Sequence, residues 1–186
     1  MSSKYKFSDN SKLYFVSFAV VYWIDLFIRN EYRKVVLDSL TFCEQNKGME
    51  LYAYCIMPSH LHLIIGSNQE PLPDIMRDFK SFTSHSLRQA ITTHATESRR
   101  EWMLWMMERA GKKNKHNKGF QLWQQDNHPI ELSTPAITKQ KLDYLHNNPV
   151  EAGFVLKAED WKHSSARNYR QLSYEKEVIL LDGMYH

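Results

Sequence analysis

Two histidines separated by a single leucine are the residues whose types and spacing most suggest chemistry. His60 and His62 lie in the segment Met-Pro-Ser-His-Leu-His-Leu-Ile-Ile-Gly, residues 57–66. Alternate residues of a β-strand point to the same face, so a strand here would place both imidazoles side by side and turn Leu61 and Leu63 towards a core. Two neutral imidazoles on one face are half of a metal site. Taken alone, the motif fits an ordinary pair of strand histidines better.

A phenol and a carboxamide, Tyr144 and Asn148, lie four residues apart much later in the sequence. On a helix they would share one face, and His146 would lie off that face. A phenol is a weak nucleophile at its ordinary pKa of about 10, but a nearby divalent cation can polarise the group that it attacks. With Asn148 as a third ligand, the two histidines would suit Mg²⁺ or Mn²⁺ acting on a phosphodiester. The alternative is a core tyrosine and a C-cap asparagine, which the spacing alone favours.

The elements that must position these groups follow from hydrophobic periodicity and turn residues. The predicted strands are residues 13–23, 51–56, 60–66 and 120–125, with a further candidate at 178–181. The predicted helices are residues 31–46, an amphipathic stripe over 75–91, 97–109, 136–147 and 161–172. Thr134 and Pro135 are expected to begin the fourth helix, and Asn148-Pro149 to end it. This order predicts an α+β domain with an antiparallel sheet that carries helices.

Composition and charge limit the class of protein. The chain has 186 residues, 42% of them hydrophobic and 24% charged, which is typical of a globular domain. A net charge of +3 allows a nucleic-acid partner without requiring one. Cys43 and Cys55 match no zinc spacing and form no disulfide framework, which favours a reducing compartment. A polar N-terminus without a signal peptide, and the lack of a long apolar run, predict a cytoplasmic protein with no membrane partner.

Several motifs, in order along the chain, resemble the HUH single-tyrosine transposases, and among these the REP-associated tyrosine transposases. The resemblance spans about residues 12–170. The motifs are residues 57–65 around the histidines, 75–82 (Ile-Met-Arg-Asp-Phe-Lys-Ser-Phe), 120–124 (Phe-Gln-Leu-Trp-Gln), 144–155 (Tyr-Leu-His-Asn-Asn-Pro-Val-Glu-Ala-Gly-Phe-Val) and 161–166 (Trp-Lys-His-Ser-Ser-Ala).

The resemblance implies a fold and a reaction. The fold would be a ferredoxin-like antiparallel sheet with flanking helices and the histidine pair on a central strand, formed by residues 12–170 between an N-terminal arm (1–11) and a C-terminal tail (171–186). His60, His62 and Asn148 would bind Mg²⁺ or Mn²⁺, and Tyr144 would cut single-stranded or hairpin DNA through a 5′-phosphotyrosine link. Some relatives act as homodimers, so a homodimer is a further expectation.

The resemblance also gives the basic residues a partner. Phosphate contacts are predicted for Arg77 and Lys80, one turn apart on a helix, and for Lys112, Lys113, Lys115 and Lys118 in a basic loop over residues 110–119. Solvated surface is an equally good explanation of such charges.

The sequence departs from the family pattern at three places. Ser59 stands where relatives usually have Asn, Tyr22-Trp23-Ile24-Asp25 stands where they often have Thr and basic residues, and residues 94–118 resemble an insertion. These departures spare the catalytic groups and affect target recognition. Three alternatives remain: a DNA-binding protein of the same fold that has lost cutting, an HUH replication initiator or relaxase, and, more remotely, a zinc hydrolase with two histidine ligands.

Overall fold

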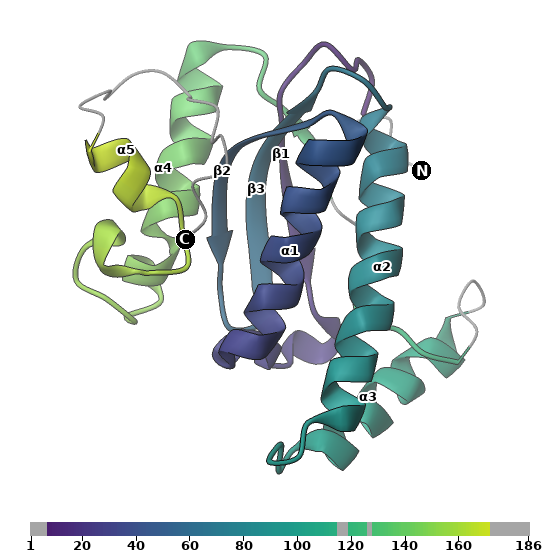
Figure 1. Ribbon diagram of the computed structural model, residues 1–186. Helices are drawn as coiled ribbons and strands as arrows, with labels where there is room; N and C mark the ends of the chain where they lie inside the picture. The colour runs from purple at the N-terminus through teal and green to yellow at the C-terminus, as the bar shows by residue number, and fades with distance from the viewer. Residues whose placement is uncertain (1–6, 115–118, 126–127, 172–186) are drawn as a thin grey trace.

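Four antiparallel strands form one sheet in the order β2-β3-β1-β4 (Figure 1). The computed structural model describes residues 7–114, 119–125 and 128–171. The elements are β1 (Tyr14–Ala19), α1 (Asn30–Lys47), β2 (Met49–Ile56), β3 (His60–Ser67), α2 (Leu72–Thr93), α3 (Arg100–Lys113), β4 (Ile130–Glu131), α4 (Pro135–Glu151) and α5 (Ala166–Gln171), with 3-10 turns at Val21–Trp23, Leu26–Ile28 and Ala158–Asp160. This is the predicted ferredoxin-like α+β arrangement, with the histidines on a central strand.

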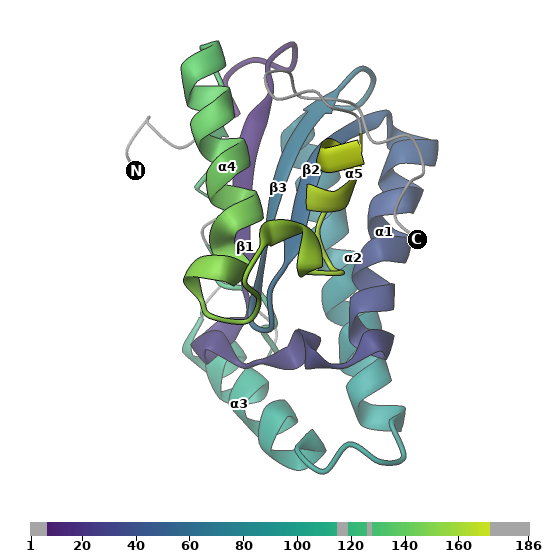
Figure 2. The same ribbon diagram turned by 90° about the vertical axis from the view of Figure 1, so that its left-hand side faces the viewer.

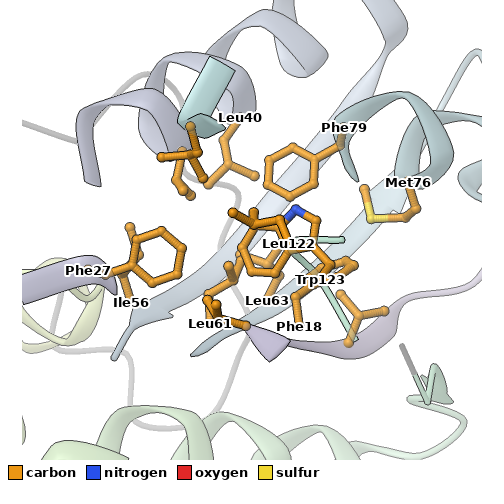
Figure 3. Packing of buried hydrophobic residues seen from close by; sticks show 14 of the residues in the cluster. Phe18, Phe27, Leu40, Ile56, Leu61, Leu63, Met76, Phe79, Leu122 and Trp123 are labelled. Carbon is orange, nitrogen blue, oxygen red and sulfur yellow. The ribbon is translucent and has the colours of Figure 1, made fainter. Parts of the chain in front are cut away.

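The alternation of side chains along β1 and β3 divides the molecule into two layers. Phe18, Leu61 and Leu63 point to the face covered by α1 and α2, where they meet Leu40 and Phe79 (Figure 3). The opposite face is covered by α4, whose Leu145 packs in a smaller apolar cluster with residues of β1, β2 and β3 (Figure 2). No helix within the described ranges is both long and apolar enough to cross a lipid bilayer.

The first predicted strand, residues 13–23, is too long. β1 ends at Ala19, whose partner is His60, the first residue of β3, so no neighbour remains to extend the ladder. The chain instead turns through Val21–Trp23, with Tyr22 and Trp23 both in the left-handed region at φ 56°.

The predicted strand at 120–125 is not formed either. Leu122 and Gln124 make backbone hydrogen bonds with Val21 and Ala19, and Trp123 forms a single bridge with Val20. The fourth strand is Ile130–Glu131, which pairs with the beginning of β1.

Three helix boundaries also differ from the prediction. α4 continues through Pro149 to Glu151, two residues beyond the proline. Its C-cap is Ala152, and Gly153 follows with φ 76°. α3 extends to Lys113, so part of the expected basic loop is helical. α5 begins at Ala166 rather than at 161. The candidate strand at 178–181 lies outside the described residues.

A buried hydrogen bond holds α4 on the sheet. His146 is 9% exposed, and its Nε2 lies 2.8 Å from Oγ of Ser165. The same serine hydroxyl accepts from the backbone N–H of Tyr54 in β2 at 3.0 Å. Burial lowers the pKa of His146 to about 4 from its ordinary 6.5. His146 is therefore neutral at pH 7 and links α4, the segment before α5 and β2.

We predict that this histidine destabilises the fold in acid. Between pH 6.5 and 4 the unfolded chain takes up a proton at His146 that the folded chain does not, so the free energy of unfolding decreases as the pH falls through this range. Chemical denaturation of His146→Gln should show a pH slope shallower by up to about 1.4 kcal/mol per pH unit. His62 and His163 have lowered pKa values too, so some slope remains. The exposed His85→Gln serves as the control, and equal slopes in the two variants would contradict the prediction.

Candidate active site

The central strand β3 presents two imidazoles on the face that α4 covers. The centroids of the His60 and His62 rings are 4.9 Å apart. In the antiparallel register His62 lies opposite Ser17 and His60 opposite Ala19, both in β1. A small residue at 19 and a hydroxyl at 17 leave room for both rings, as the predicted strand alternation requires.

Helix α4 brings Tyr144 and Asn148 to this pair within one chain. The ring centroid of Tyr144 lies 5.4 Å from that of His62, and Oδ1 of Asn148 lies 3.3 Å from Nε2 of His60. Their four-residue spacing puts both on the helix face that packs over the strand. Tyr144 remains 41% exposed, and its hydroxyl makes no hydrogen bond to any described residue. A phenol open to solvent and two imidazoles therefore share one site.

Both imidazoles are neutral at pH 7. His62 is 5% exposed and its ring stacks on Phe15 at 5.4 Å. Burial, with smaller contributions from the neighbouring charges of His60 and Lys141, lowers the pKa of His62 to about 3. Burial also lowers the pKa of His60, while its hydrogen bond with Asn148 partly opposes this. Neutral imidazole is the form that binds metal ions.

The donor set fits a divalent cation. Oγ of Ser17 lies 2.7 Å from Nδ1 of His62, and Oγ of Ser59 lies 3.2 Å from Nδ1 of His60. With Nδ1–H of His62 donating to the Ser17 hydroxyl, Nε2 of His62 keeps a free lone pair. Nε2 of His60 donates to Oδ1 of Asn148 in the metal-free protein, and the other tautomer, with Nδ1–H donating to Ser59, would free its lone pair for a cation. Nε2 of His62 is indeed buried without a hydrogen-bond partner in the described structure.

The distance between His60 and Asn148 also agrees with a shared cation. Two neighbouring ligands of an octahedral cation at about 2.1 Å lie about 3 Å apart, close to the separation of His60 Nε2 and Asn148 Oδ1. The described residues contain no group of three or more His, Cys, Asp or Glu side chains placed to hold a metal. The amide oxygen of Asn148 is therefore a donor that could complete a site at the histidine pair.

Two residues of the site, Lys141 and Ser17, were not predicted from the sequence. Nζ of Lys141 lies 5.6 Å from the ring centroid of Tyr144 and 5.3 Å from that of Phe15. Its position three residues before Tyr144 is a helical signal that could have identified it. Ser17 could not be found in this way, because its contact with His62 depends on the pairing of β1 with β3.

The predicted phosphate contacts are spread over the molecule. Arg77 and Lys80 lie on α2, which covers the other face of the sheet (Figure 1). Arg77 pairs with Asp74 and Asp78, and Nζ of Lys80 donates to the carbonyl of Gln124 at 2.9 Å. The structure therefore does not bring these two cations to the histidine pair.

The other predicted contacts lie at or beyond the end of α3. Lys112 and Lys113 form its last turn, and Lys113 lines a cleft that begins at Ser17. Lys115 and Lys118 lie outside the described residues.

Comparison with known proteins places this geometry in a family. A family model described as "Transposase IS200 like" matches residues 15–125, a range that contains the histidine pair and ends before Tyr144. A search of curated proteins finds no match.

Solved structures give the fold. The REP-associated tyrosine transposase bound to a REP hairpin is similar over 100% of this chain and 94% of its own, with a TM-score of 0.66 and 15% identity. A candidate transposase from Deinococcus radiodurans R1 matches 78% of this chain and 97% of its own at 20% identity, with a TM-score of 0.45. The family match covers more than half of the sequence and includes the strand that carries the histidine pair. The chain therefore belongs to the IS200-like transposase family.

Proposed function

We propose that this transposase cuts and rejoins single-stranded DNA by transesterification, with Tyr144 as the nucleophile and Mg²⁺ or Mn²⁺ held by His60, His62 and Asn148. The observation that best supports the proposal is the meeting of a solvent-accessible phenol with two neutral, buried imidazoles on one face of the sheet. Phosphoryl transfer to a phenol needs a positioned nucleophile and charge stabilisation at the phosphate, and this site offers groups for both.

The proposed cleavage exchanges one phosphate ester bond for another, so it needs no ATP. The phenolic oxygen of Tyr144 forms a bond to phosphorus while the bond from phosphorus to the 3′ oxygen breaks. The phenolic proton leaves to solvent, and the 3′ oxygen takes up a proton to become a hydroxyl. The product is a 5′-phosphotyrosine ester, and attack by a 3′-hydroxyl reverses the step. One ester replaces another, so no ATP is consumed.

The protein groups divide the remaining work among them. Ser17 and Ser59 orient the two imidazoles so that both Nε2 atoms face the site. Lys141 places a positive charge beside the phenol ring, where it attracts the phosphate that the phenol attacks. When bound, the divalent cation would neutralise charge on the phosphate oxygens.

Hairpin-forming DNA is the substrate class that we propose. Family membership supports DNA as the substrate, and the REP-associated transposase of the same fold is bound to a REP hairpin. A second chain is not needed for the tyrosine, because one chain contributes every proposed group; the predicted homodimer would thus serve another purpose. An inactive DNA-binding protein would bind hairpins without nicking them under either cation. If the protein were instead a replication initiator or relaxase, it would also cut single-stranded DNA that forms no hairpin.

We predict that Tyr144→Phe abolishes the covalent protein–DNA adduct. Wild-type protein incubated with Mg²⁺ or Mn²⁺ and hairpin DNA from the flanks of its gene should yield an adduct on a denaturing gel, because the phenol becomes esterified. The matched control is Tyr52→Phe, whose hydroxyl bonds Glu50 and not the site. Equal adduct from Tyr144→Phe would show that another residue is the nucleophile.

The serine that orients His62 should affect metal affinity. Loss of a group that fixes a metal-binding histidine typically weakens binding about 10- to 100-fold, so Ser17→Ala should bind Mn²⁺ more weakly by that factor in calorimetric titration. His62→Ala should abolish the same binding event, and Ser81→Ala on α2 should leave it unchanged. Unaltered Mn²⁺ affinity in both site variants would mean that the cation binds elsewhere.

Lys141→Met should slow cleavage about 10-fold or more without changing Mn²⁺ affinity. The lysine is 5.6 Å from the phenol ring and partly exposed, so its effect should be smaller than that of a directly bonded charge. Lys139→Met removes a lysine that is two residues away and paired with Asp143, and should cleave at the wild-type rate. The measurement is the single-turnover rate of DNA cleavage. Equal rates for Lys141→Met and Lys139→Met would show that Lys141 does not contribute to cleavage.

A further inference from the structure

A cleft of about 860 Å³ opens directly beside the histidine pair. Ser17, whose hydroxyl contacts His62, is one of its lining residues. The turn that contains Tyr22 and Trp23 also lines it, as do Gln121, Gln124 and Gln125. The volume is within the range of small-ligand sites and is large enough to hold a nucleotide.

Trp23 occupies an unusual position in this cleft. It is 60% exposed, and its ring meets that of His60 nearly edge to face, with centroids 5.5 Å apart. Both Trp23 and Tyr22 have φ of 56°, a conformation that bulky side chains seldom adopt and that costs free energy. An indole that burial does not stabilise is thus held on a strained turn within contact of a proposed metal ligand.

Hydrogen bonds hold residues 121–125 in place along the cleft, and the exposed side chain of Gln125 is among the residues that line it. Nζ of Lys80 donates to the backbone carbonyls of Gln124 and Gln125 at 2.9 and 3.4 Å. Nε2 of Gln124 donates to the carbonyl of Val20. The side chain of Gln125 is exposed and has no hydrogen-bond partner among the described residues. A carboxamide combines a donor and an acceptor, so it can bond both N6 and N7 of an adenine, an arrangement that a pyrimidine does not offer.

The charge of the lining distinguishes a base from a phosphate. Among the described residues, the lining includes Lys113 but no carboxylate and no arginine; its other polar groups are hydroxyls, amides and one histidine. Grooves that follow the DNA backbone are strongly cationic, whereas sites for unpaired bases combine aromatic faces with amide and hydroxyl groups. The cleft has the second composition.

We propose that this cleft binds one unpaired purine that flanks the phosphodiester attacked by Tyr144, with Trp23 stacked on the base and Gln125 bonded to its edge. This inference rests on the proposed cleavage of single-stranded DNA and adds a determinant of where the cut is made. Stacking next to His60 would fix the nucleotide, and with it the scissile phosphate, relative to the site.

The test uses full-length protein with Tyr144→Phe, so that DNA binds without being cut. Hairpin oligonucleotides carry single-stranded flanks in which 2-aminopurine replaces each base in turn, and fluorescence and affinity are measured. At one flank position the probe should be quenched, and Trp23→Ala should weaken binding about 10-fold, the usual effect of losing one stacked base. Trp23→Phe should restore most of the affinity. Trp102→Ala, which removes another exposed indole, on α3, should have no effect.

Two further measurements separate base binding from a structural effect. Replacing the quenched position by an abasic nucleotide should make Trp23→Ala and wild-type affinities equal. Gln125→Ala, which breaks no bond within the described structure, should reduce the preference for adenine over 7-deazaadenine at that position. Wild-type affinity in Trp23→Ala, or a loss that persists with the abasic flank, would overturn the inference.

Cleavage by the unmodified protein distinguishes this inference from the proposed function. If Tyr144-dependent cutting occurs but Trp23→Ala binds normally, only the cleft assignment fails. If Trp23-dependent binding occurs without cutting under Mg²⁺ or Mn²⁺, the cleft assignment stands and the cleavage proposal fails. Absence of any binding to the hairpins would overturn both.

Discussion

The packing of α4 across the face of β3 is the constraint on which the rest of the site depends. Neither element alone has a site: the strand presents two imidazoles, and the helix presents a phenol and a carboxamide. The two residues that follow Tyr144 are both anchored: Leu145 is buried against the sheet, and His146 is hydrogen-bonded to Ser165. These two contacts fix the rotation of the helix while the phenol itself stays accessible. Positioning within a fraction of an ångström is what a nucleophile requires.

Burial then determines the chemistry that the histidines can perform. An exposed histidine titrates near pH 6.5, but desolvation keeps both His60 and His62 neutral, and so unable to act as acids near pH 7. A buried imidazole nitrogen without a partner normally costs free energy, and His62 Nε2 is such an atom. A ligand that accepts its lone pair would recover that cost. The burial that keeps both imidazoles neutral also leaves Nε2 of His62 as a lone-pair donor that the proposed cation would use.

The surfaces around the site are unequal. The face covered by α1 and α2 is a continuous apolar core, and its cations Arg77 and Lys80 are engaged by carboxylates or backbone carbonyls. The α4 face is only partly covered and opens into the cleft at the end of β1. Lys80 connects the two, since it is on the core side but holds the segment that lines the cleft. A residue predicted to contact phosphate thus has a structural role here.

The sequence by itself determined the local features. Strand alternation placed His60 and His62 on one face, helical spacing placed Tyr144 with Asn148, and the order of elements with family motifs predicted the ferredoxin-like α+β fold. These succeed because they depend on backbone periodicity, which is short-ranged. Boundaries failed where partners decide them: β1 stops because β3 begins at His60. Residues 120–125 form no strand because they lie along the end of β1 and the turn after it, where Trp123 makes only a single bridge with Val20.

Only the tertiary structure decided how distant segments meet. The contact of Ser17 with His62 follows from inter-strand register, and the burial that keeps the histidines neutral follows from the packing of α4. The cleft beside Trp23 is formed by two segments about a hundred residues apart in the sequence. The hydrogen bonds that join them produce no periodic pattern of hydrophobic residues in either segment, so the sequence does not predict them. The free energy of long-range pairing depends on the whole assembly. The sequence therefore identifies the candidate groups, while the fold sets their distances, their protonation and their access to solvent.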